Sequence, residues 1–173
     1  MAGAIDGVPL LLQVAKQQVE ELELKTSELH QHFSGPLRGS TMLVNGLRYI
    51  NARYELIAIG LFSLFEARMQ THSPKRFFQG IISSLNDANC QDLATQFEIY
   101  YLAINVLKHG EGSSFQKLLE KSSLPFEIER AGSEFAKEGD AAKPEGLINI
   151  VDTNFFPGLL HTLDSVYEFL EGE

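Results

Sequence analysis

Two long runs of regularly spaced apolar residues, joined by a short polar segment, constrain the fold of this chain more than any other feature. One run recurs at alternating three- and four-residue steps from Leu12 to Phe33, and the other does so from Leu43 to Leu64. This spacing is typical of one apolar row along a long helix. Pro9 suits the first turn of a helix, and Gly35-Pro36 predicts its end. The short loop SGPLRGS therefore predicts an antiparallel helical hairpin.

The second predicted helix is apolar on more than one side. Its main row consists of Leu43, Leu47, Ile50, Tyr54, Ile57, Leu61 and Leu64, and a second row of Ile59, Phe62 and Phe65 widens it. A helix of this kind needs several neighbours to cover it. Because the first helix offers only one apolar row, we expect apolar area near the stretch IAIGLFSLF to remain for a two-fold interface. The chain is therefore predicted to be a homodimer.

Further helices are predicted after Ser73-Pro74, which breaks the second one. The first of them starts at Ser73-Pro74 and has its inward-facing residues between Phe77 and Leu85. The others cover about 91–109, 114–121 and 155–170. Between the last two, PFEIER alternates with period two and LINIV is a short β-branched run, so they predict two short strands of a flap. Residues 131–146, rich in Gly, Ala, Lys and Glu, are predicted to be a mobile surface loop. We expect a single, mainly α domain over residues 1–173, an antiparallel bundle built on the long hairpin.

Charge and cysteine content exclude several kinds of partner and cofactor. The net charge of −9 disfavours non-specific binding to nucleic acid or to an anionic membrane. A single cysteine, Cys90, cannot form an internal disulfide and excludes a zinc site built from several thiolates. The stretch from Leu56 to Phe65 is too short to span a bilayer, and the first residues lack the basic region of a signal peptide. We predict a cytoplasmic protein without metal or cofactor.

The stretch YLAINVLKHGEGSS, at the end of the predicted 91–109 helix, holds the strongest candidate site. Asn105 interrupts an apolar run, and Asn is a poor residue for the middle of a helix. Glu98, Asn105 and His109 fall along one side of this helix, with Tyr101 beside them. This polar stripe is either a solvated face or a binding site.

The same stretch also has a purely structural interpretation. Lys108 and His109 in a last turn complement the helix dipole, and Gly110 suits a left-handed turn just beyond it. Ser113 and Gln116 have the spacing of a capping box that starts the next helix. Only Asn105 is left unexplained by helix punctuation.

Polar residues also interrupt the apolar rows near the end of the second helix. Arg68 falls where the main row would continue, and Glu66 follows Phe62 on the second row. Each is either at a frayed helix end or paired inside the bundle. The Glu66 carboxylate could orient an imidazole or pair with Lys108. We therefore predict that Asn105 and His109 face Glu66 or Arg68 across a helix–helix contact.

The long hairpin, the motif LFSLFEARM and a helix ending in NVLKHGEG together resemble the HEPN superfamily, over roughly residues 43–119. That resemblance implies an all-helical, often dimeric domain, and many of these proteins are RNA-cutting toxins or defence components. Its nucleases carry an Arg, four to six residues and then a His, with a polar residue after the Arg. Here His109 matches the His and Asn105 the polar residue, but Ile104 stands at the position of the Arg.

Two functions of different classes follow. The first is a HEPN-like protein that acts mainly through protein–protein contacts, in a toxin–antitoxin or defence setting. The second is a metal-independent ribonuclease with His109 as general acid or base, Asn105 positioning the RNA and Lys108 or Arg68 binding phosphate. In both readings Glu66, Arg68 and Tyr101 are candidate binding residues, and RNA is a partner only in the second.

Overall fold

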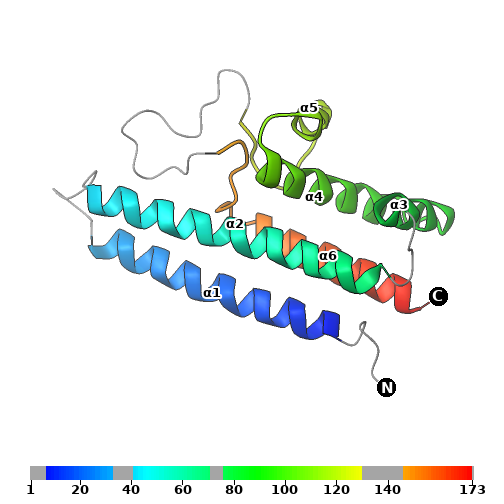
Figure 1. Ribbon diagram of the computed structural model, residues 1–173, viewed down its shortest axis with the longest axis horizontal. Helices are drawn as coiled ribbons and strands as arrows, with labels where there is room; N and C mark the ends of the chain where they lie inside the picture. The colour runs from blue at the N-terminus through cyan, green and yellow to red at the C-terminus, as the bar shows by residue number, and fades with distance from the viewer. Residues whose placement is uncertain (1–6, 33–40, 71–75, 130–145, 173) are drawn as a thin grey trace.

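The computed structural model describes residues 7–32, 41–70, 76–129 and 146–172, and within these ranges the regular structure is helical (Figure 1). The helices are α1 (Val8–His32), α2 (Thr41–Met69), α3 (Phe77–Asp87), α4 (Gln91–His109), α5 (Ser113–Glu120) and α6 (Phe155–Glu171). The mainly α fold and the long hairpin predicted from the sequence are confirmed. The ends of α4 match the predicted range, because Gly110 and the preceding turn mark them clearly in the sequence.

Four of the helices form a closed ring. Helix α1 packs on α2, α2 on α4, α4 on α6, and α6 back on α1. Neighbours in this ring run in opposite directions, as Figure 1 shows. The shorter helices α3 and α5 pack on α4, one toward each of its ends. The result is an antiparallel four-helix bundle with two short helices attached to one of its members.

The buried row of α2 differs from the row expected from the sequence. Leu64, expected in the core, is 48% exposed, whereas Phe65 and Met69 are completely buried. A strict 3.5-residue repeat drifts around a straight α-helix, which has 3.6 residues per turn. Over the length of α2 this drift turns Leu64 outward, whereas Phe65, from the predicted second row, is buried as expected. The same rotation moves Arg68 off the buried row, which continues at Met69.

In the turn after α4, the prediction for Gly110 is confirmed and the predicted capping box is not. Gly110 has φ 72° and ψ −146°, a backbone conformation open almost only to glycine. The capping box predicted for Ser113 and Gln116 does not form, because Gly112 occupies the N-cap of α5 and no side chain caps that helix. The chain therefore enters α5 one residue earlier than expected.

The predicted flap is reduced to a single bridge. Ile128 and Ile148 pair in antiparallel fashion, with hydrogen bonds from Glu129 N to Leu147 O and from Asn149 N to Glu127 O. The two runs do meet as expected, but no strand longer than this bridge forms within the described residues. Both isoleucines are buried, so the bridge closes one end of the core. The predicted loop over 131–146 lies, apart from Gly146, outside the described residues.

Aromatic rings fill the core between α4, α6 and the bridge segment. The ring of Tyr100 lies 5.6 Å from that of Phe126 and 5.7 Å from that of Phe155. Its hydroxyl group points at Gly158 of α6, where a Cβ atom would lie 2.0 Å from the oxygen. Only a glycine leaves room for this contact. Burial, and secondarily the charge of Asp152, raise the pKa of Tyr100.

Candidate functional site

The three residues predicted to be catalytic lie in the last turns of α4. Lys108 and His109 are exposed, and Asn105 is half-buried. Among the residues that the structure describes, none of these three side chains makes a hydrogen bond or an ion pair. The end of α4 is therefore an accessible polar surface.

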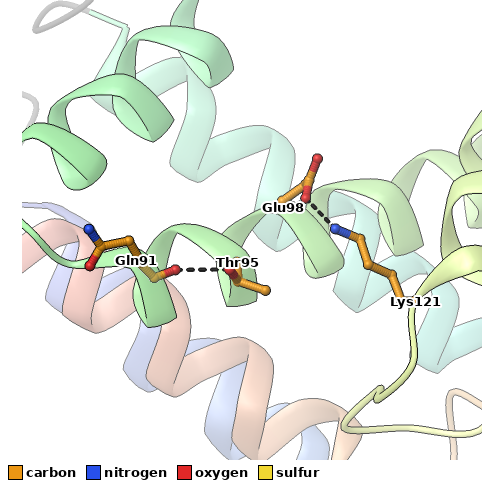
Figure 2. A network of polar contacts seen from close by, with 4 residues as sticks. All are labelled: Gln91, Thr95, Glu98 and Lys121. Atoms are coloured by element: carbon orange, nitrogen blue, oxygen red, sulfur yellow. Dashed lines mark hydrogen bonds and ion pairs between the residues drawn. The ribbon is translucent and has the colours of Figure 1, made fainter.

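The other members of the polar stripe on α4 have structural partners. Glu98 accepts a hydrogen bond and forms an ion pair with Lys121 at 2.5 Å, as Figure 2 shows. This contact ties the segment after α5 to the middle of α4. The ring of Tyr101 stacks on Phe78 of α3, with centroids 3.8 Å apart. Glu98 and Tyr101 thus hold the two short helices against α4, a role that the spacing along α4 did not reveal.

Arg68 is engaged at the other end of the bundle. Its Nη1 donates a hydrogen bond to the carbonyl oxygen of Gly7, 61 residues earlier in the chain, just before α1. The start of α1 is thereby fastened to the end of α2. Arg68 closes the hairpin at its open end, and Glu66 lies half a turn earlier on the same helix.

The structure does not bring Asn105 and His109 to Glu66 or Arg68. The rings of Phe62 and Tyr101 lie 6.2 Å apart, which fixes the level at which α2 and α4 meet. From this point the two helices run in opposite directions. At 1.5 Å per residue, His109 lies ~12 Å toward one end and Arg68 ~9 Å toward the other. The predicted contact is wrong, because the C-terminal ends of antiparallel helices point away from each other.

A different pair of polar residues on α2 lies toward the end of the bundle that holds Asn105. Counting back from Phe62, Glu55 and Asn51 come two and three turns before the level of Tyr101, toward the end of the bundle that holds Asn105. The Asn51 side chain donates a 3.0 Å hydrogen bond to the Glu55 carboxylate. Burial raises the pKa of Glu55, against a smaller lowering by the Asn51 bond. Sequence analysis missed this pair, although its four-residue separation on a helix is the signal that could have found it.

The side of α2 that points away from the core forms a long surface feature. We call this the outer face of α2, and it consists of Met42, Asn45, Tyr49, Ala52, Leu56, Gly60, Ser63 and Ala67. These residues follow one another at three- and four-residue steps, so they form one continuous stripe. All are exposed or partly exposed, and none is charged. Met42, Tyr49 and Leu56 are 73%, 65% and 72% exposed.

Two further observations limit the chemistry of the described residues. No group of three or more His, Cys, Asp or Glu side chains comes together there in a way that could hold a metal ion. None of the described helices is both long enough and apolar enough to cross a membrane.

Comparison with known proteins adds no relative. No protein-family model, no curated protein and no solved structure matches this chain. The resemblance to the HEPN superfamily therefore stays a prediction, and the argument for function rests on the surface itself.

Proposed function

We propose that this protein is a helical interaction module that binds a protein partner through the outer face of α2. The observation that carries the proposal is the uncharged, largely apolar stripe along this helix. A contiguous exposed apolar patch of this length marks an interaction site more often than chance exposure. The acidic chain around it, with a net charge of −9, makes an uncharged stripe more unusual still.

The part of α1 around Leu24 shows what an ordinary solvated face looks like in this protein. Leu24 of α1 is 67% exposed, about as much as Leu56. Its neighbours one turn away are Glu20, Glu21, Ser27 and Glu28, whereas those of Leu56 are Ala52, Arg53, Ile59 and Gly60. An isolated exposed leucine among carboxylates needs no explanation. Leu56 lies instead in a stripe that contains no charged residue.

A pair of matched variants tests this function. Leu56→Glu places a charge in the middle of the outer face, and Leu24→Glu adds the same charge to an equally exposed site on α1. Tagged protein is purified from its native cells, and the species that accompany it, including untagged copies, are identified by mass spectrometry. We expect at least one species that Leu56→Glu removes and Leu24→Glu leaves. If no accompanying species depends on Leu56, the proposal is wrong.

The ribonuclease alternative depends on His109, Asn105 and a nearby cation. Lys108 is adjacent in sequence and exposed, whereas Arg68 lies at the far end of the bundle. Incubation of purified protein with mixed RNA, with His109→Ala as control, tests it. Cleavage that His109→Ala abolishes would establish the nuclease and displace the interaction module as the main function.

A further inference from the structure

We propose that the partner of the outer face of α2 is the same face of a second copy of this chain, with the two α2 helices antiparallel. This inference rests on the proposed function and names its partner. The two-fold axis would pass at the level of Tyr54 and Glu55, near the middle of the helix. A two-fold interface needs a surface that is complementary to itself.

Large and small side chains are distributed unevenly along the outer face. The large ones, Met42, Tyr49 and Leu56, are seven residues apart and lie toward its N-terminal part. Beyond Leu56 the stripe continues with small residues, among them Gly60 and Ala67, also seven apart. One part of the stripe is therefore ridged, and the other is hollow, with the exposed Leu64 along its edge.

Antiparallel pairing places each ridge on a hollow. With the axis between Tyr54 and Glu55, Met42 of one copy meets Ala67 of the other, and Tyr49 meets Gly60. Leu56 lies close to the axis, between Ala52 and Arg53 of the other copy. Alternation of large and small residues at facing positions is what gives a well-packed helix–helix contact.

Parallel pairing would not use this distribution. Each large residue would then meet its own copy, so two Tyr49 rings would face each other and two Gly60 positions would leave a gap. Layers that alternate between crowded and empty pack poorly. The order of residue sizes along α2 therefore favours the antiparallel arrangement.

Gly60 is the most specific part of the match. A Cβ atom built on it would find no heavy atom within 4 Å, so the protein itself leaves this position open. Glycine in the middle of a helix costs roughly 0.5–1 kcal/mol relative to alanine. A second copy that inserts the Tyr49 ring there provides a reason for the missing side chain.

The area of the face is sufficient for a stable dimer. From Met42 to Ala67 the stripe is ~37 Å long. At roughly 150 Å² for a tyrosine ring and ~100 Å² each for Met42 and Leu56, the three large residues of both copies contribute about 700 Å². The small residues and the rim bring the total to the ~1,000 Å² that a specific interface needs.

One charge opposes the pairing at its edge. Arg53 borders the stripe near the axis, so the two copies of this residue would come near each other. Salt screens repulsion between exposed charges. We therefore expect the dimer to strengthen between 50 and 500 mM salt, where an interface held by ion pairs would weaken.

Sedimentation equilibrium at 1–100 μM measures the association. We expect the wild type to approach twice 19.3 kDa within this range. Leu56→Arg should raise the dimer Kd at least ~10-fold because it adds a positive charge beside the two Arg53 side chains at the axis, and Leu24→Arg should leave it unchanged. Circular dichroism checks that both variants keep their helix content. A wild type at 19.3 kDa throughout overturns the second copy as partner, whereas a foreign species lost with Leu56→Glu would leave the proposed function intact.

A size exchange tests the antiparallel register. Tyr49→Ala removes the ring that fills the space over Gly60, and Gly60→Leu places a side chain where that ring would lie. Each substitution should therefore weaken the dimer. The double variant should bind more tightly than Gly60→Leu alone, since the new leucine meets the shortened side chain at position 49. If the losses of binding free energy in the two single variants simply add in the double variant, Tyr49 and Gly60 are not in contact.

Disulfide trapping gives an independent readout of orientation. In a Cys90→Ser background, Met42→Cys with Ala67→Cys should form a covalent dimer on mild oxidation, and Met42→Cys alone should not. Bridging requires the two Cα atoms to approach within ~7 Å, which antiparallel pairing allows only between these different positions. Efficient trapping by Met42→Cys alone would show parallel pairing and overturn the proposal.

Discussion

Gly158 lies so close to the Tyr100 hydroxyl group that no larger residue fits at position 158. A Cβ at position 158 would lie 2.0 Å from the Tyr100 hydroxyl oxygen and 3.1 Å from Cζ. We expect Gly158→Ala to lower the free energy of unfolding by ~1–3 kcal/mol, as overpacking of a core does. Adding Tyr100→Phe removes the clashing oxygen and should restore part of that loss. Urea titrations of the two single variants and the double variant measure this, and a Gly158→Ala protein as stable as wild type would contradict it.

Glu55 should make stability depend on pH in the acidic range. Burial raises the pKa of Glu55 in the folded protein above the value of 4.5 that it has when unfolded. A raised folded-state pKa means a stabilising contribution that is complete below pH 4.5 and is lost as pH rises through the folded pKa. Glu55→Gln keeps the hydrogen-bonding partner of Asn51 without the charge. The variant should gain stability over wild type at pH 7 and lose the advantage near pH 4, as thermal melts at both pH values would show.

At the scale of elements, the buried row of α2 can be checked by truncation. Leu61 and Ile104 are 3% and 1% exposed, so Leu61→Ala and Ile104→Ala should each cost ~2–5 kcal/mol of unfolding free energy. Leu64→Ala, in the same helix but facing outward, should change it by less than ~0.5 kcal/mol in the monomer. Chemical denaturation at low protein concentration separates the three. A large loss of unfolding free energy for Leu64→Ala would show that this residue is buried.

The helices were predictable because their apolar spacing and their Gly and Pro boundaries are local signals. The exposure of Leu64 was not, since a 3.5-residue and a 3.6-residue repeat diverge only over many turns. Only part of the candidate site, the polar positions on each helix, was predictable. The polar positions on α2 and α4 could be read from each helix, but which end of one helix meets which end of the other depends on chain direction. Asn105 consequently lies toward the end of α2 that holds Glu55 rather than toward the end that holds Arg68.

At the scale of the whole molecule, self-association should appear in the thermal stability. Unfolding of a dimer is coupled to dissociation, so its Tm rises with protein concentration. We expect the Tm of the wild type to rise by several degrees from 1 to 100 μM, and that of Leu56→Arg to stay constant. Scanning calorimetry over this range measures the effect. A Tm independent of concentration for both proteins would mean that the monomer unfolds alone.

The ring of four helices has a consequence for how the chain is made. Helix α1 is complete at His32, yet α6, which covers its open side, is complete only at Glu171. At synthesis rates of ~5–20 residues per second, roughly 7–30 seconds pass between the two. During that time the apolar side of the hairpin that α6 later covers is accessible to any chaperone near the ribosome exit. Protease sensitivity of stalled nascent chains should therefore fall only once α6 has emerged.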